Sequence, residues 1–159
     1  MSLEGRAEVL RRRQRLKALF RSIDDAGLDA ELTSHYSRYL CVLVSGYAEQ
    51  SIKALAGCYC EKRSERRVHR YAAGQLSKLR NFDLERLRQL VQGFSPEWWD
   101  LIEDQRSDDL VAFTSVAAVR NAISHGTDTG ITIGTITQYF DQISRVLDDL
   151  CVLFDPVNA

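Results

Sequence analysis

The chain has 159 residues, of which 45% are hydrophobic and 27% charged, and its net charge is −1. This mixture excludes a disordered chain and is typical of one globular domain spanning residues 1–159. No run of about 18 apolar residues occurs, so we expect no transmembrane helix, and the net charge alone predicts no nucleic-acid partner. The early charges do not fit a signal peptide. Residues 1–3 are compatible with a cloning remnant and carry no argument.

The first two elements are expected to be long amphipathic helices. Across residues 4–24 apolar side chains recur at helical spacing, and Gly27 is a natural stop. Residues 29–61 carry an apolar stripe that is wide enough to place this second helix in the middle of a bundle. The stripe consists of Leu32, Tyr36, Tyr39, Leu40, Leu43, Tyr47 and Ile52.

Three shorter helices are expected next. Residues 65–79 have a helical, basic pattern, and Asp83 is a good cap for a helix that runs to about Gln92. The sequence Ser95-Pro96-Glu97 predicts a further helix start, because it combines a capping serine, proline at the first position and an acid near the positive helix end.

The C-terminal part is expected to hold two more helices. Ser107 is predicted to cap a separate helix over 108–125, which Gly126 would end. Residues 127–134 are expected to form a loop, partly extended, and residues 135–154 the last helix. The predicted fold is therefore an all-α bundle with a long central second helix and a C-terminal helix.

The cysteines and histidines predict neither a metal site nor a cofactor. The four cysteines, Cys41, Cys58, Cys60 and Cys151, lack zinc or redox spacing, so we expect reduced side chains in a cytoplasmic protein. The three histidines form no carboxylate–histidine cluster at the spacing of metal ligands.

Charge is unevenly distributed along the chain. Residues 1–24 carry seven Lys/Arg against three Asp/Glu, and residues 62–88 carry nine against three. Residues 97–110 reverse the balance, with six acids and one base. The basic stretches are able to attract a polyanion, but on charge alone solvated helix faces are the favoured explanation.

The one concentration of polar chemistry lies at the end of an apolar helix. From Leu110 to Gly126 the only ionisable residues are Arg120 and His125, so we expect a helix that is buried nearly all round. A buried arginine needs a partner. That partner is either a carboxylate such as Glu49 or an anion that enters a cleft.

Helical geometry places these polar residues near one another. Arg120 and His125 flank one face of the helix, and Asn121 and Ser124 lie between them. Such a site would open at the mouth of the bundle. Structural explanations stay open for each residue: the helix dipole favours a cationic His125, Asn121 can satisfy a neighbouring backbone group, and Arg120 can form an ion pair.

The segment Arg120-Asn121-Ala122-Ile123-Ser124-His125 resembles the Arg-x4-6-His signature of the HEPN domain superfamily. The stretch Ser45-Gly46-Tyr47-Ala48-Glu49 and the region from Asp83 to Trp99 are similar to the branch called RiboL-PSP-HEPN. This resemblance spans roughly residues 39–126.

The resemblance implies a helical bundle that dimerises and brings two Arg–His motifs together across a cleft. It implies metal-independent RNA cleavage, often by toxins or antiviral defence effectors. Arg120 and His125 would be catalytic, Asn121 and Ser124 would support them, and Glu49 would position Arg120. The partners would be a second copy, RNA and a cognate antitoxin. The alternative is a catalytically silent module for dimerisation or for binding RNA or protein.

The residue chemistry is compatible with this activity. RNA carries its own nucleophile, the 2′-hydroxyl, and histidine is the side chain suited to proton transfer near neutral pH. The guanidinium of an arginine can bind a phosphate through two parallel hydrogen bonds and stabilise the charge that develops on it.

Overall fold

The computed structural model describes residues 5–157, so residues 1–3 and Glu4, the expected helix start, lie outside the described residues. The described chain is an all-α bundle without a strand. Its helices are α1 (Gly5–Asp25), α2 (Ala30–Arg63), α3 (Arg66–Lys78), α4 (Leu84–Phe94), α5 (Pro96–Ser124) and α6 (Ile133–Leu153). Within residues 5–157, none of these helices has the length and apolar character needed to cross a lipid bilayer.

Local capping explains where several helices begin. Asp29 accepts a hydrogen bond from the Leu32 N–H, and Asp83 accepts one from the Arg86 N–H, each at 2.9 Å. The hydroxyl of Thr132 accepts from the Thr135 N–H at 3.2 Å at the start of α6. These contacts satisfy N–H groups that have no partner inside the helix. The expected starts near residues 29 and 83 are confirmed.

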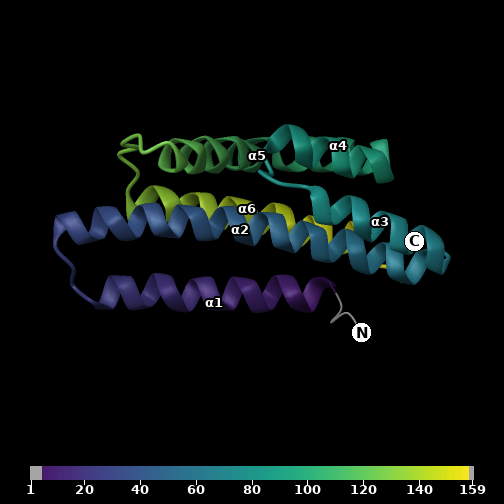
Figure 1. Cartoon of the computed structure of the whole chain (residues 1–159), viewed down its shortest axis with the longest axis horizontal. Coiled ribbons are helices and arrows are strands. Elements are labelled where there is room, and N and C mark those ends of the chain that lie inside the picture. The colour runs from purple at the N-terminus through teal and green to yellow at the C-terminus, as the bar shows by residue number, and fades with distance from the viewer. Residues whose placement is uncertain (1–4, 158–159) are drawn as a thin grey trace.

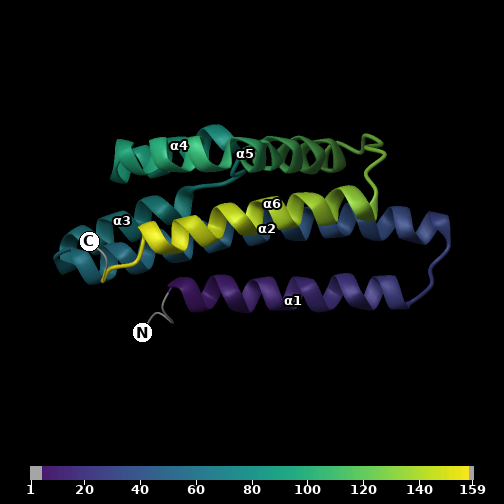
Figure 2. The ribbon, with the colours of Figure 1, turned by 180° about the vertical axis from the view of Figure 1, so that it is seen from behind.

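The helices form layers (Figures 1 and 2). α1 lies under the pair α2 and α6, and α4 and α5 lie above that pair. Helix α2 contacts α1, α3, α5 and α6, which confirms its expected central position. The bundle interior is filled by large apolar side chains that are almost fully buried. They include Leu40, Ile52, Phe113, Ile136, Phe140, Ile143 and Leu147.

A polar network ties the three lower helices together. Arg13 on α1 donates from Nε to the Tyr47 hydroxyl on α2 at 2.9 Å, and it also donates to the Ser144 carbonyl on α6 at 3.1 Å. Tyr47 and Ser144 share a further hydrogen bond at 3.0 Å. Because Tyr47 and Ser144 are buried, these bonds fix the three helices in register.

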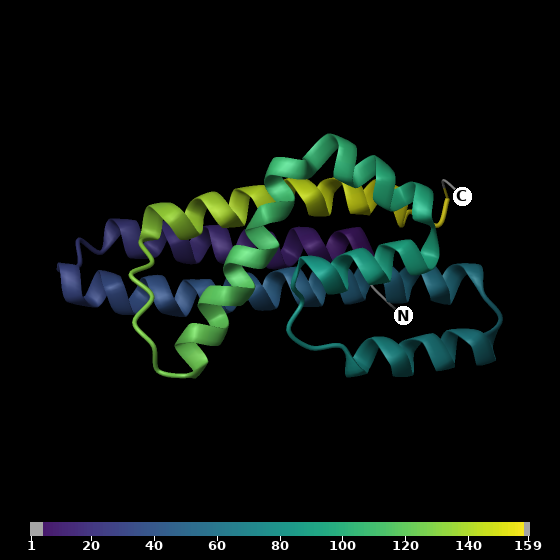
Figure 3. The same cartoon turned by 90° about the horizontal axis from the view of Figure 1, so that it is seen from above.

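Helix α5 is kinked at Arg106, and Figure 3 shows the bend. Arg106 leaves helical geometry, at φ −129° and ψ 22°, so α5 consists of two helical segments joined across a kink. The predicted start of a separate helix near Ser107 is confirmed to within one residue, because the break falls at Arg106. Arg106 donates from Nε to Asp149 on α6 at 2.6 Å, and Arg145 on α6 binds Asp109 at 2.7 Å and 3.0 Å. These two pairs attach α5 to α6 at the bend and just after it.

One burial expectation is wrong. The second half of α5 is buried along one face only: Val111 is 58% exposed, and Ala118 is exposed, because α5 covers α2 and α6 from above and no helix within residues 5–157 lies above it. The N-terminal part of the α2 stripe is open as well. There Leu32, Tyr36 and Tyr39 are 45%, 39% and 52% exposed, because the stripe is wider than the surface that neighbouring helices cover.

Candidate functional site

The Arg120–His125 segment ends α5 in a Schellman motif. The Thr127 N–H donates to the Ala122 carbonyl at 2.9 Å, and the Gly126 N–H donates to the Ile123 carbonyl at 3.0 Å. Gly126 has a φ of 72°, the left-handed conformation that this motif requires and that glycine adopts without strain. The prediction that Gly126 ends this helix is confirmed. The motif places His125 at the C-cap, where its side chain is exposed.

Arg120 is half-buried and points back towards the loop between α3 and α4. Its guanidinium donates a hydrogen bond to Oδ1 of Asn81. Asn81 itself has a φ of 54°, which asparagine tolerates better than most side chains. The Asn81 amide is neutral, so it orients the guanidinium without cancelling its charge.

Glu49 is paired with a lysine and not with Arg120. The Lys53 ammonium binds the Glu49 carboxylate at 3.0 Å and donates to the Leu79 carbonyl at 2.6 Å. The direct pairing expected between Glu49 and Arg120 is therefore absent from the ion pairs of residues 5–157. Lys53 instead links α2 to the same loop that carries Asn81.

Glu49 and Arg120 nevertheless line one cleft, with a volume of about 490 Å³, on the open side of α1 and α2. The apolar part of its wall consists of Leu16, Leu19, Val42 and Leu43. The polar part includes Ser45, Gln50, Arg12 and Arg15. Arg12 already pairs with Glu8 at 2.7 Å. Within the described chain, Arg15 and Arg120 have no carboxylate at ion-pair distance, so the cleft is electropositive and suited to an anion.

The other predicted site residues lie on the exposed end of α5. The Ser124 hydroxyl donates to the Arg120 carbonyl at 3.0 Å, which ties it to its own helix. Asn121 and His125 are exposed. His125 follows Arg120 by five positions, which corresponds to about 140° around the helix. Arg120 therefore faces the bundle, and His125 faces solvent.

Sequence reasoning missed three residues of this site: Asn81, Lys53 and Arg15. Asn81 lies in a short loop, and no local pattern connects it with Arg120. Lys53 stands four residues after Glu49, the spacing of a helical ion pair, and this signal was available. Among residues 5–157, no three His, Cys, Asp or Glu side chains are grouped closely enough to bind a metal ion together.

A helical bundle with an Arg-x4-His motif closing a helix defines a HEPN-like domain. The RiboL-PSP-HEPN family matches residues 7–154, and the chain belongs to this family, as the sequence resemblance predicted. No curated protein and no solved structure matches the chain. HEPN domains often dimerise and act on RNA.

Proposed function

We propose that this protein is a metal-independent endoribonuclease that works as a homodimer, with Arg120 and His125 as catalytic residues. The observation that carries the proposal is the partner of Arg120. If Arg120 were purely structural, a buried carboxylate would be expected beside it. Its described partner is the neutral amide of Asn81, so the guanidinium retains its charge and can bind a phosphate.

The proposed reaction uses the RNA 2′-hydroxyl as nucleophile. His125 removes its proton, and the oxygen attacks the adjacent phosphorus. Arg120 binds the non-bridging phosphate oxygens and stabilises the charge that develops on them. The bond to the 5′-oxygen breaks, and that oxygen is protonated by His125 of the partner subunit. The products are a 2′,3′-cyclic phosphate and a 5′-hydroxyl. Asn121 and Ser124 would contact the phosphate or orient it.

A dimer would account for the open part of the α2 stripe. Leu32, Tyr36, Tyr39 and Val42 form an exposed apolar strip at helical spacing, and Val42 also lines the cleft beside Arg120. A second copy that covers this strip would bring its own Arg–His motif close to the cleft.

The cellular role that fits such an activity is that of a toxin or an antiviral defence effector in the cytoplasm. A free ribonuclease harms its host, so a cognate antitoxin protein is a partner that this role would require.

The test is cleavage of mixed RNA in EDTA by the wild type and by His125→Ala, Arg120→Ala and Arg120→Lys. Loss of His125 removes proton transfer, which contributes roughly 10²–10⁴-fold. Loss of Arg120 removes a charge-stabilising donor, worth about 10²–10³-fold. Arg120→Lys should also be poor, because lysine cannot make the two-pronged contact. Lys17→Ala, which removes an exposed charge on α1 away from the cleft and from the α2 strip, is the control and should cut normally.

Several outcomes would contradict the proposal. Activity that EDTA abolishes, equal cutting of a 2′-deoxy substrate, or full activity of pure His125→Ala would each refute the mechanism. RNA binding without turnover in the wild type would favour the catalytically silent binding module. Light scattering should show a dimer at micromolar concentration, and a clean 18.1 kDa monomer would contradict the shared site.

A further inference from the structure

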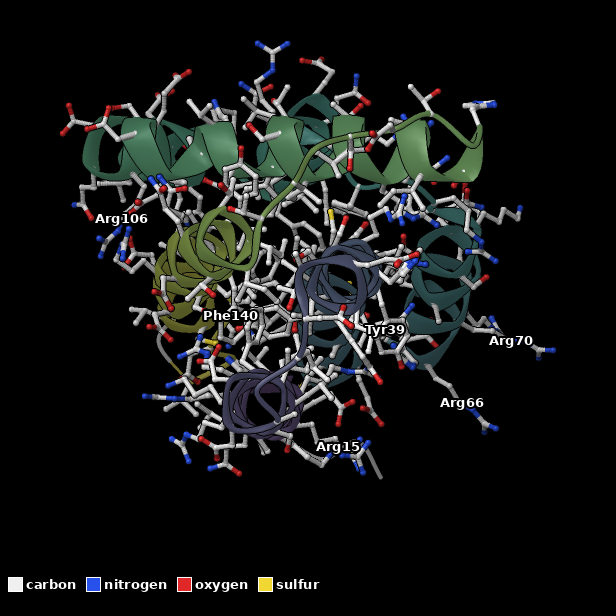
Figure 4. All side chains as sticks on the ribbon, turned by 90° about the vertical axis from the view of Figure 1, so that its left-hand side faces the viewer. Arg15, Tyr39, Arg66, Arg70, Arg106 and Phe140 are labelled. Carbon is white, nitrogen blue, oxygen red and sulfur yellow. The ribbon has the colours of Figure 1, made fainter. Side chains whose placement is uncertain are left out.

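Helix α3 projects from the bundle and is unusually exposed. It packs against α2 alone among the helices, and Leu76 is its one buried residue. Figure 3 shows α3 standing apart from α4 and α5, and Figure 4 shows the labelled Arg66 and Arg70 side chains pointing away from the bundle. A helix held by a single contact face leaves most of its circumference free for a ligand.

The outward face of α3 combines positive charge with an exposed aromatic ring. Opposite Leu76, helical geometry places Arg67, Arg70, Tyr71 and Lys78 on one side. Tyr71 is 70% exposed, and none of the described aromatic contacts involves it. Gly74, one turn after Arg70, has nothing within 4 Å of the position a Cβ would take, so the backbone there is open to close approach.

These basic side chains are not neutralised by the protein. Within residues 5–157, no carboxylate lies at ion-pair distance from Arg66, Arg67 or Arg70. The neighbouring acid Glu65 accepts a hydrogen bond from the Arg67 backbone N–H at 3.1 Å and so caps the helix. The positive charge of this face is therefore available to bind an external polyanion.

We infer that α3 is a binding arm for single-stranded RNA, an inference that rests on the proposed ribonuclease function. Arg67 and Arg70 bind backbone phosphates, and the Tyr71 ring stacks on a base, which is the usual combination of contacts for single strands. The loop that follows α3 carries Asn81, the hydrogen-bond partner of Arg120. A strand held on α3 therefore continues over this loop towards the guanidinium.

RNA fits this face better than a membrane does. A helix that lies in a lipid surface needs a broad apolar face. The apolar side of α3, with Leu76, packs on α2, and the exposed apolar side chains of α3 are Val68 and Tyr71. These two neighbouring side chains, with arginines around them, make too narrow an apolar surface for a membrane and fit a phosphate backbone with an occasional stacked base.

The test uses His125→Ala protein, so that binding is measured without cleavage, and a labelled single-stranded RNA of about 12 nucleotides. Fluorescence anisotropy gives the affinity over a range of salt concentrations. Replacing Arg67 and Arg70 by Gln should lower the slope of log affinity against log salt by about 1.4, since each lost phosphate contact contributes about 0.7. Tyr71→Ala should weaken binding about tenfold, and Tyr71→Phe should restore it.

The matched control is the double variant Lys17→Gln, Arg21→Gln, which removes two exposed charges from α1 away from the cleft. It should leave the salt slope unchanged. An equal effect of both double variants would overturn the inference, because it would show non-specific attraction. Unchanged binding in the α3 variants would overturn it too. So would α3-dependent sedimentation with phosphatidylglycerol vesicles in the absence of α3-dependent RNA binding.

Failure of this inference is distinguishable from failure of the proposed function. Cleavage is assayed separately, with His125 intact. Protein that cuts RNA but binds it independently of α3 contradicts the arm alone. If the protein binds RNA through α3 but never cuts it, the ribonuclease proposal is contradicted, while the inference about α3 is retained.

Discussion

Arg120 donates a hydrogen bond to the side-chain oxygen of Asn81, which lies 39 residues earlier in the chain. The left-handed backbone of Asn81 directs its amide from the α3–α4 loop towards the end of α5. The guanidinium is thereby oriented by a group that carries no charge. Orientation without neutralisation is what an arginine needs if it is to bind an anionic substrate.

The first prediction concerns Asn81→Gly. Glycine adopts a φ of 54° without strain, so the variant removes the acceptor and leaves the loop intact. RNA cleavage should fall at least about tenfold, because a hydrogen bond to a charged group contributes roughly 1.5–3 kcal/mol. Asn81→Asp keeps the acceptor but neutralises Arg120, and it should be slower than the wild type as well. Initial rates measure both, and three equal rates would show that Asn81 has no part in the reaction.

The second prediction concerns pH and Asp109. Its hydrogen bonds with Arg145 hold the pKa of the buried Asp109 carboxyl below its usual value. A folded pKa below the unfolded one adds stability above the unfolded pKa, and this stability is lost as pH falls through the folded pKa. Asp109→Asn should therefore cost about 1–2 kcal/mol at pH 7 in urea unfolding. The difference from the wild type should shrink as pH falls from about 4 to 2. A constant difference over this range would contradict the assignment.

The third prediction compares two glycines. A Cβ on Gly5 would lie 2.9 Å from the Ala54 carbonyl oxygen, a backbone atom that cannot move aside. Gly5→Ala should therefore weaken the packing of α1 on α2 and destabilise the protein by roughly 1–3 kcal/mol. Gly57→Ala is the matched control, since its Cβ would meet only the Leu76 side chain at 3.9 Å. It should stabilise α2 by about 0.5–1 kcal/mol. Thermal unfolding measures both changes in stability. Equal shifts of the melting temperature in the two variants would contradict the close contact at Gly5.

The fourth prediction concerns the cysteines, which form no disulfide within the described chain. Burial raises the pKa of Cys41 and of Cys151 to about 11. At pH 8 only about one thousandth of each is thiolate, the reactive form. Titration with a thiol reagent should find four thiols in unfolded protein, whereas in folded protein only the half-buried Cys60 should react quickly. Cys60→Ser should abolish that fast phase. Fast reaction of three thiols in folded protein would contradict the buried positions.

Sequence patterns located the features that depend on near neighbours. Asp29, Asp83 and Gly126 act on groups within a few residues of themselves, so the helix ends that they set were predictable. The composition of the site was also partly predictable, because Arg120 and His125 are the only ionisable residues in the apolar stretch from Leu110 to Gly126.

Features that depend on packing between helices were not predictable in this way. The apolar stripe of α2 identifies a face but not which part of it a neighbour will cover, so the exposure of Tyr36 and Tyr39 came only with the structure. Asn81 reaches Arg120 because of the path of the α3–α4 loop, and Glu49 meets Lys53 instead of Arg120. The kink falls at Arg106, one residue before Ser107, and the hydrogen bond from Arg106 to Asp149 on α6 is a contact between helices that no local pattern indicates.

The bend at Arg106 makes the second half of α5 a lever arm. From Arg106 to Ser124 the helix extends on the order of 27 Å, at a rise of about 1.5 Å per residue. A change of about 10° at the bend would move the far end by roughly 5 Å, more than the length of a hydrogen bond. The Arg106–Asp149 pair holds the bend, so it influences the position of the Arg120–His125 motif without touching it. Genetic screens for loss of activity should recover substitutions at Asp149 as well as at the motif.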